Sequence, residues 1–213
     1  MKFKVFFSFF LVAFAGVVFA QDENEHIRLK NEGNVELRVP NYQKALELYE
    51  ASVALWPEDA AQDAAMIYNM AECARRLNDN DKALTYYTQS KTLNYRPDRA
   101  AYNMALIMKT LNREEEMEQL LVESIENNKE STILAQKTRM LVTYYLTQGA
   151  EHYNRAAQIL ASAANANPSQ YDEINQRANE SFSEAKPWFE KALKYDPENA
   201  NAINSLKEIN SRK

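Results

Sequence analysis

The stretch Tyr68-Asn69-Met70-Ala71 recurs 34 positions later as Tyr102-Asn103-Met104-Ala105. The echo continues in Leu77-Asn78 and Leu111-Asn112, and one gap-free window of 34 residues shares eight identical positions with the next. Ordinary residue usage would give about two. A fixed period of this length is that of one helix–turn–helix unit, which buries its apolar face only by stacking on a neighbour. The repeat therefore predicts an all-α protein built from stacked helix pairs.

The first twenty residues have the pattern of a secretory signal peptide. Lys2 and Lys4 precede an apolar or small run over 5–19, and Ala20 ends a small-residue cleavage sequence. A membrane anchor is the weaker alternative, because the run falls short of the ~20 apolar residues that cross a bilayer. We expect cleavage after Ala20 and a mature chain without an integral membrane segment, located in the periplasm or cell envelope.

The composition excludes several classes of protein. The chain carries a net charge of −5, which becomes −7 once the two lysines of the signal are removed. An acidic chain argues against generic binding of nucleic acid. Its single cysteine, Cys73, cannot form an internal disulfide, and three glycines leave little room for β-turns or phosphate loops. We expect one helical domain over 21–213 that is held together by packing alone.

With the 34-residue frame extended in both directions, the chain resembles the tetratricopeptide repeat (TPR) family. Units of that family have small residues at positions 8, 20 and 27, an aromatic residue at 24 and often a proline at 32. The second unit matches with Ala71, Ala83, Tyr87 and Ser90. The resemblance implies a right-handed superhelical solenoid of about five helix pairs plus a C-terminal capping helix. The predicted segments are units at 26–59, 64–97, 98–131, 137–170 and 171–197 and a cap at 199–211.

The fourth and fifth units depart from this pattern. Tyr144 occupies the small position of unit four, whose two helices are expected to meet in a turn around His152. Pro168 and Pro197 end their units only 29 residues apart, so unit five is five residues short. We expect its first helix to be out of register. That helix is either separate from the next one or continuous with it and kinked at Pro187.

Catalytic chemistry has little support in the sequence. Its two histidines, His26 and His152, have no set of neighbouring ligands with metal-site spacing. Cys73 is interpreted as a packed small hydrophobe, with a reactive thiol as the alternative. The chain contains no glycine-rich phosphate loop, nucleophile elbow or nucleic-acid motif. We therefore expect no catalytic residues, no cofactor, no metal site and no nucleic-acid partner.

The TPR resemblance implies a concave groove that binds a partner peptide, lined by positions 2, 5, 6, 9, 12 and 13 of each first helix. In units one to three, six of these positions are basic and one is acidic, although the chain as a whole is acidic. Such charge separation favours an acidic or carboxylate-bearing partner. The alternative is that the cations only stabilise helix C-termini. In unit four the same positions are uncharged and comprise Thr138, Leu141, Val142, Tyr145 and Gln148. The candidate partner-binding residues are Lys30, Asn34, Arg38, Tyr68, Asn69, Arg75, Arg76, Arg99, Tyr102, Asn103 and Lys109.

A subset of these residues resembles a carboxylate clamp. Chaperone-binding TPR domains hold a peptide's terminal carboxylate with basic and asparagine side chains, and Lys30, Asn34, Asn69 and Arg99 match those positions in type. Asn103 stands where the last basic residue is expected, so one charge-assisted donor is missing. The resemblance therefore extends the partner class to proteins with a free C-terminal carboxylate.

The leading hypothesis is a non-enzymatic protein–protein interaction scaffold of the cell envelope, which binds a peptide or helix of its partner in the basic groove. Tyr68 and Tyr102 are its expected central contacts, because tyrosine offers a large amphipathic surface at low entropic cost. The alternative is a structural or oligomerisation spacer of an envelope complex that has no groove ligand.

Overall fold

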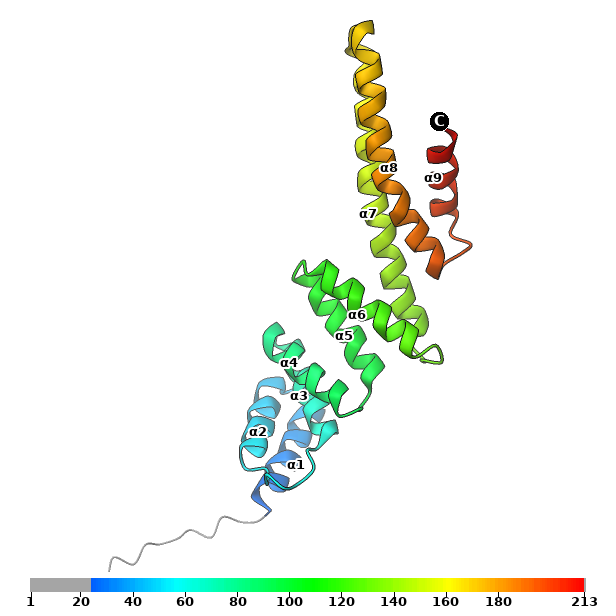
Figure 1. The fold of residues 1–213 in the computed structure, drawn as a ribbon. Coiled ribbons are helices and arrows are strands. Elements are labelled where there is room, and N and C mark those ends of the chain that lie inside the picture. Colours follow the sequence, from blue (N-terminus) through cyan, green and yellow to red (C-terminus); the bar gives the residue numbers. More distant parts are fainter. Residues whose placement is uncertain (1–23, 213) are drawn as a thin grey trace, which may run out of the picture. The chain divides into compact units, whose positions relative to one another are not determined.

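The computed structural model describes residues 24–212, so the predicted signal peptide lies outside the described part. Within that part the chain forms nine α-helices and two 3₁₀ turns and no strand, which confirms the predicted all-α class (Figure 1). The helices are α1 (Glu25–Arg38), α2 (Tyr42–Ala54), α3 (Ala64–Arg76), α4 (Asn80–Thr92), α5 (Pro97–Thr110), α6 (Glu114–Asn127), α7 (Leu134–Ser162), α8 (Tyr171–Tyr195) and α9 (Ala200–Ser211). Among these residues, no helix has the length and apolar character to span a membrane.

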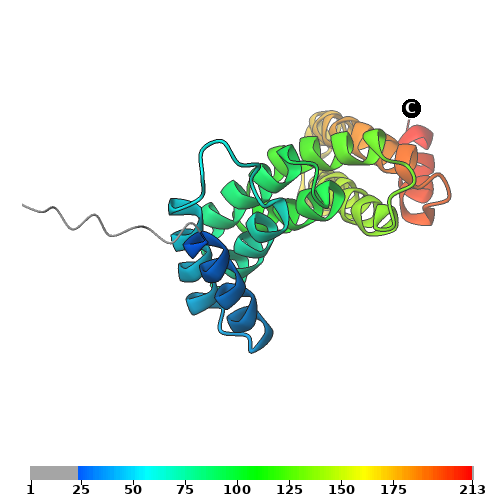
Figure 2. The same cartoon turned by 90° about the horizontal axis from the view of Figure 1, so that it is seen from below.

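The described chain forms two compact units, which meet in sequence between Ala60 and Ala61. The boundary falls in the irregular segment that separates the first two predicted repeats. The first unit holds α1 and α2, which lie side by side as an antiparallel pair (Figure 2). A Cβ on Gly33 would come within 2.7 Å of the Tyr49 ring, so only glycine permits this close approach. The prediction of one domain over 21–213 stays a prediction.

In the second unit, α3 with α4 and α5 with α6 form two regular helix pairs. Asp63 and Asp79 cap α3 and α4, each accepting a hydrogen bond from a backbone N–H three residues later. The turn inside each pair uses an asparagine in the left-handed conformation, with φ of 59° at Asn78 and 55° at Asn112. Asparagine tolerates this conformation better than most residues do. The repeated Leu-Asn dipeptide therefore marks where each first helix ends.

The packing of these two pairs agrees with the predicted positions. The small residues Ala71 and Ala105 are fully buried, as are Tyr87 and Leu121, the bulky residues predicted opposite them. Small side chains let two helices approach closely, and the bulky ones fill the remaining space. The same pattern of residues thus forms the core of each pair.

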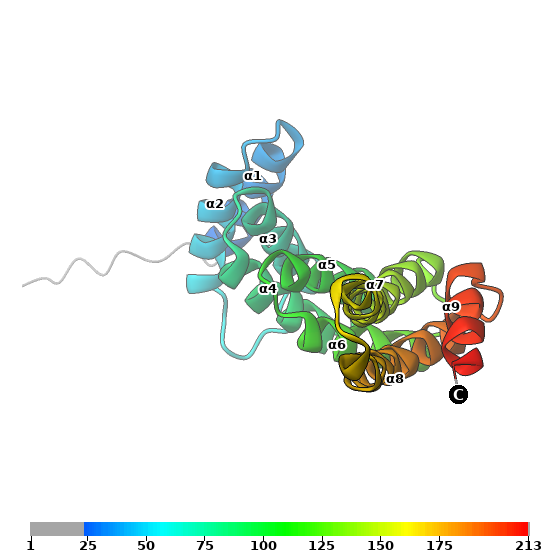
Figure 3. The ribbon, with the colours of Figure 1, turned by 90° about the horizontal axis from the view of Figure 1, so that it is seen from above.

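The third pair of the second unit consists of α7 and α8, two long helices that run side by side (Figures 1 and 3). The predicted turn around His152 is wrong, because α7 is continuous from Leu134 to Ser162. In the predicted frame Glu151 stands where Asn78 and Asn112 stand, and glutamate favours helix over the left-handed turn. The described residues therefore form four helix pairs and a closing helix, one pair fewer than predicted.

The α8 helix resolves the alternative that the sequence left open. It is continuous through Pro187, so the first helix of the predicted fifth unit and the second one are a single helix. The α9 helix then follows, with the Asn199 side chain accepting a hydrogen bond from the Ala202 N–H at 3.2 Å. It packs on α8 and agrees with the predicted cap at 199–211.

A glycine contact reveals the repeat register of the α7–α8 pair. A Cβ on Gly149 would lie 2.9 Å from the Phe189 ring, as one on Gly33 would lie against Tyr49. Gly33 and Tyr49 are 16 residues apart, whereas Gly149 and Phe189 are 40 apart. The α7–α8 pair is therefore one repeat whose two helices are extended by 24 residues in all. Its small position is Gly149 and not Tyr144.

Candidate protein-interaction surfaces

Three of the predicted groove residues lie on α1 in the first unit. The Lys30 ammonium is 5.9 Å from the centre of the Trp56 ring, and the Asn34 side-chain oxygen accepts a hydrogen bond from the Tyr49 hydroxyl at 2.9 Å. Arg38 is exposed at the end of the helix. Asn34 is thus engaged in the packing of its own helix pair. The other candidates belong to the second unit.

Glu72 organises a polar network that joins α3, α4 and α5. Its carboxylate accepts hydrogen bonds from Arg75 at 2.8 Å, from Asn103 at 2.7 Å and from the Tyr87 hydroxyl. Arg75 and Asn103 also donate to the Tyr87 oxygen, at 3.2 and 3.0 Å. Two predicted partner-binding residues, Arg75 and Asn103, are therefore held within the protein and stiffen the base of this surface.

The network keeps Glu72 ionised. Burial alone would raise the pKa of this carboxyl, but hydrogen bonds from Tyr87 and Arg75 outweigh it and lower the pKa. Burial and the Glu72 carboxylate together raise the pKa of Tyr87 well above its ordinary value. The acid is thus a fixed acceptor and the phenol a fixed donor.

Tyr68 lies beneath the surface that it was expected to present. Its side chain is 3% exposed and contacts the rings of Tyr87 and Tyr95 edge to face, at centroid distances of 5.6 and 5.8 Å. The Arg96 guanidinium lies 5.4 Å from its ring centre. Burial, followed by the charge of Glu72, raises the pKa of Tyr68 to about 12. Tyr68 is thus a core residue, and the expectation that it makes a central partner contact conflicts with this placement.

The α5 helix leaves a row of four residues open, spaced at three, four and three positions: Arg99, Tyr102, Leu106 and Lys109. Arg99, Leu106 and Lys109 are exposed and Tyr102 is half-buried. Within 24–212, neither Arg99 nor Lys109 forms an ion pair. We call this row the basic strip. On the neighbouring α3, Asn69 is half-buried and Arg76 is exposed.

A cavity of about 490 Å³ lies at the beginning of α5. Its lining residues are Arg96, Pro97, Asp98, Arg99, Thr132 and Ile133. The charge of Asp98 is matched by Lys137, whose ammonium is fully buried and donates to Asp98 at 2.7 Å and to two oxygens of Ser124 at 2.9 Å. The two arginines therefore leave this end of the basic strip with an excess of positive charge.

The predicted groove lining of unit four is wrong, because three of its five residues are buried. Leu141, Val142 and Tyr145 are buried, and the Tyr145 ring packs on Trp188 and Tyr195 of α8. The Gly149 register instead assigns the groove positions of α7 to six residues that lie toward its middle. They are Thr143, Leu146, Thr147, Ala150, Tyr153 and Asn154.

These six residues line one wall of a cavity of about 610 Å³ between α7 and α9. The other wall repeats the same spacing on α9, with Asn201, Asn204, Ser205 and Glu208, and Phe189 completes it. Glu208 accepts hydrogen bonds from Tyr153 and from Arg212, the latter at 2.6 Å. Most polar groups of the lining are therefore neutral amides and hydroxyls. Sequence reasoning missed this surface, and Gly149 was the signal that could have located it.

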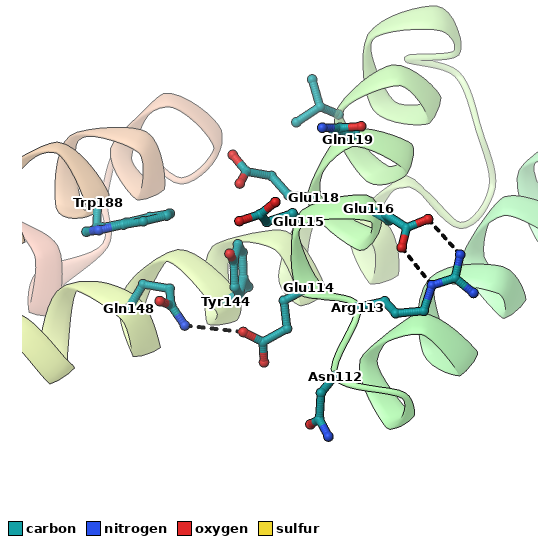
Figure 4. A pocket seen from close by; sticks show the side chains of 11 residues that line it. Asn112, Arg113, Glu114, Glu115, Glu116, Glu118, Gln119, Tyr144, Gln148 and Trp188 are labelled. Carbon is teal, nitrogen blue, oxygen red and sulfur yellow. Dashed lines mark hydrogen bonds and ion pairs between the residues drawn. The ribbon is translucent and has the colours of Figure 1, made fainter.

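A further cavity, of about 880 Å³, lies between α6 and the α7–α8 pair (Figure 4). Its α6 wall is acidic, with Glu114, Glu115, Glu116 and Glu118, and Tyr144, Gln148 and Trp188 lie opposite. Glu114, Glu115 and Glu116 lie in the first turn of α6, where negative charge is favourable to the helix dipole. Among residues 24–212, no three His, Cys, Asp or Glu side chains are grouped closely enough to hold a metal ion.

The cysteine and the two histidines considered for catalysis are buried or in contact with neighbouring side chains. Cys73 is fully buried, and burial followed by the nearby Glu72 charge raises the pKa of its thiol to about 11. His26 packs edge to face on Trp56 at 4.8 Å, and His152 Nδ1 lies 3.0 Å from a Glu184 oxygen. A thiol with a raised pKa is a poor nucleophile at neutral pH.

Comparisons with known proteins agree with this architecture. Models of the tetratricopeptide repeat match residues 26–95 and 177–199. The Photosystem I assembly protein Ycf3 of Acaryochloris marina is 40% identical over 68 residues, which are 32% of this chain and 40% of that relative's length.

A solved structure supports the same fold. A TPR repeats protein from Bacteroides fragilis superposes with a TM-score of 0.58 at 20% identity, over 89% of this chain and all of its own. YrrB, described as a TPR protein with an unusual peptide-binding site, covers 87% of this chain and 94% of its own at 14% identity and a TM-score of 0.45. The repeat models match two separate parts of the chain, which therefore contains tetratricopeptide repeats near both ends of the described residues.

Proposed function

We propose that this protein is a non-enzymatic interaction scaffold whose α3–α5 surface binds an acidic segment of a partner protein. The TPR fold is generally a module for protein–protein interaction. A relative that matches part of the chain is, by its name, an assembly protein. Assembly requires contact with other proteins. Both facts support the class of function and leave the partner open.

The basic strip carries the choice of an acidic partner. Arg99 and Lys109 stand exposed at its two ends, and Tyr102 with Leu106 supplies apolar area between them. The α3–α5 network beneath holds the backbone of the strip in place. A cationic surface on an acidic chain steers a negatively charged partner and fixes its register. Side chains three and four positions apart share one helix face, so an extended peptide can contact all four residues.

The cavity between α7 and α9 supports the same class of function. Its lining residues occupy the repeat positions that the basic strip occupies on α5. Asn201 and Asn204 each offer an amide donor and an amide acceptor, which suits the main chain of an extended peptide. We infer that this cavity recognises backbone, whereas the basic strip recognises charge.

We also propose an envelope location, which rests on the signal-like sequence of residues 1–20. Mass spectrometry of the purified protein tests it through the mature N-terminus. We expect the chain to begin at Gln21 after expression in a bacterium with an intact secretion pathway. An uncleaved chain that stays in the cytoplasmic fraction would contradict the proposal.

Fluorescence anisotropy with a short labelled peptide of alternating glutamate and alanine tests the basic strip. The double variant Arg99→Gln/Lys109→Gln should bind about tenfold more weakly at low salt, because two charge contacts are lost. The matched control is Arg155→Gln/Lys207→Gln, which removes the same charge from exposed positions of α7 and α9 and should bind like wild type.

Equal binding by all three proteins would contradict an acidic-peptide site on α5. Light scattering on the same samples examines the alternative of an oligomerisation spacer. A defined oligomer that binds no peptide would favour that alternative.

A further inference from the structure

The cavity of Figure 4 differs in charge and composition from the groove positions. It lies at the seam where α6 meets α7 and α8, and none of its lining residues occupies a groove position of the Gly149 register. We propose that this seam is a second interaction surface, which binds a segment of a partner protein that carries arginine or lysine side chains.

The charges of the seam are only partly satisfied within the protein. Arg113 neutralises Glu116 through two contacts of 2.6 and 2.7 Å. The Glu118 carboxylate accepts from the Lys191 ammonium at 2.8 Å. Glu114 has one neutral partner, the Gln148 amide at 3.4 Å, and Glu115 is exposed with no ion pair among the described residues. Two carboxylates therefore remain available to a cation.

Aromatic rings face these carboxylates across the cavity. Figure 4 shows Tyr144 and Trp188 on the side opposite the acidic side chains of α6. Their ring centres lie 5.9 Å apart in an edge-to-face arrangement. A cation over an aromatic face gains from the ring quadrupole, most strongly with tryptophan. A wall of rings opposite a wall of carboxylates thus suits a guanidinium or ammonium that carries an aliphatic stem.

The protein's own Lys191 shows that this chemistry holds a cation. Its ammonium lies 2.8 Å from Glu118, 4.5 Å from the centre of the Trp188 ring and 5.3 Å from that of Tyr145. One carboxylate and two rings therefore bind a lysine side chain at the edge of the seam. Glu114, Glu115 and Tyr144 repeat the combination of carboxylate and ring without an internal cation.

The equivalent seam one repeat earlier lacks these features. A cavity of about 480 Å³ lies between α4 and α5, and its lining includes Asp81, Leu84, Thr85 and Thr88. These residues precede Glu115, Glu118, Gln119 and Val122 by one period of 34. Among the described residues, the only acidic one that lines the earlier seam is Asp81, and Arg113 lies at its edge. Its described lining includes two methionines and no aromatic residue. The acidic and aromatic character is therefore particular to the α6–α8 seam.

An ion of calcium or another metal fits the seam poorly. Hard cations need several oxygen ligands within about 2.6 Å. Within residues 24–212, no group of acidic side chains converges in that way. The carboxylates are instead distributed along the first two turns of α6. That spacing matches cationic side chains carried at intervals on a peptide.

Tryptophan fluorescence offers a direct test, because Trp188 lies in the seam and the chain has only two tryptophans. In a Trp56→Phe background, titration with an alternating arginine–alanine peptide should change the Trp188 emission saturably. The affinity should fall about tenfold between low salt and 0.3 M salt, and a glutamine–alanine peptide should have no effect.

Paired variants assign the binding to the seam. Glu114→Gln/Glu115→Gln should weaken binding about tenfold. Glu180→Gln/Glu198→Gln is the matched control, because it removes the same charge from exposed positions outside the seam. Circular dichroism confirms that each variant is folded.

Three results would overturn the proposal. The arginine peptide could leave the emission unchanged at low salt. Both double variants could bind equally, in which case the acidic chain attracts the peptide without a site. Spermine, a free polyamine, could bind as tightly as the peptide, in which case no protein segment is recognised. None of these outcomes depends on the acidic-peptide experiment, so the two proposals fail separately.

Discussion

The regular pairs α3–α6 and the long pair α7–α8 place a small residue against a bulky one in the same way but end their first helices differently. In the regular pairs an asparagine in the left-handed conformation, Asn78 or Asn112, turns the chain back after 13 or 14 helical residues. In the Gly149 register the equivalent residue of α7 is Ala156, and the helix continues for another six residues to Ser162. One residue type at one repeat position thus separates a compact repeat from an extended one.

The two regions also differ in what they leave exposed. The groove positions of α5 stay open, and the basic strip results. The positions predicted to be groove on α7 are covered by α8, while the groove positions of the Gly149 register lie further along the helix and face α9. A shift of five positions in the frame therefore moves Leu141 and Tyr145 from surface to core. The charge and location of each candidate surface follow from the register.

The largest expected effect concerns the residue that ties the two regions together. Lys137 of α7 is fully buried and bonds to Asp98 of α5 and Ser124 of α6. Lys137→Ala should lower the free energy of unfolding by about 4 kcal/mol, because it leaves a partly buried carboxylate without its partner. Urea denaturation followed by circular dichroism measures this.

Lys129→Ala is the control for that variant, since Lys129 is exposed just before α7. It should change the free energy of unfolding by no more than about 0.5 kcal/mol. Similar small losses for both variants would show that Lys137 does not join the regular and extended repeats.

The continuity of α7 predicts the next largest effect. Glu151→Pro should destabilise the protein by about 3 kcal/mol, because proline inside a helix removes a hydrogen bond and clashes with the preceding turn. Glu151→Ala should be nearly neutral, since alanine favours helix. Chemical denaturation compares the two. A proline variant as stable as the alanine variant would instead support a turn at this point.

The Asp98 carboxyl predicts a pH dependence. Burial alone would raise its pKa, but hydrogen bonds from Lys137, Ser131 and Asn128 outweigh it and lower the pKa in the folded state. A lowered pKa stabilises the fold above the ordinary value of about 3.9, and this contribution is lost as the pH falls through the lowered value. Between pH 6 and pH 2.5, Asp98→Asn should therefore lose about 1 kcal/mol less stability than wild type. Parallel pH profiles of the urea midpoint would refute the lowered pKa.

The smallest effect distinguishes the two groove surfaces. Asn201→Ala/Asn204→Ala should weaken binding of the alternating glutamate–alanine peptide about threefold, because amide contacts to the peptide backbone contribute less than charge contacts. The matched control is Asn179→Ala/Asn210→Ala, at exposed positions outside the cavity. Anisotropy of the labelled peptide measures both. An unchanged affinity in the cavity variant would confine binding to the basic strip.

Much of the fold could be predicted because the repeat is locally encoded. Ala71 with Tyr87 and the paired Leu-Asn dipeptides recur without gaps, and each feature decides a local structure that its neighbours reinforce. The alternation of helices in units one to three and the closing helix follow from these signals. The fourth unit failed because a fixed period of 34 was imposed where the helices are longer. Gly149 and the helix-forming Glu151 carried the opposite information.

The candidate surfaces were less predictable because they depend on contacts between distant residues. Nothing local to Tyr68 indicates that Tyr95 and Arg96 will cover it. Arg75 and Asn103 look like free donors until Glu72 and Tyr87 are brought beside them. The acidic seam likewise requires α6 and α8 to meet, which places Trp188 opposite residues some 70 positions earlier in the sequence. Spacing identifies a helix face, whereas tertiary packing decides whether that face is open.

The distance between spin labels at positions 139 and 158 tests the central claim that α7 is one extended helix with its small position at Gly149. Both residues are exposed, and a Cys73→Ala background leaves only the introduced cysteines, Arg139→Cys and Gln158→Cys. A continuous helix separates them by about 28 Å at 1.5 Å per residue. Pulsed electron–electron double resonance should give a narrow distribution of label-to-label distances near that value. A distribution below about 15 Å, as a turn at 149–152 would produce, would contradict the account.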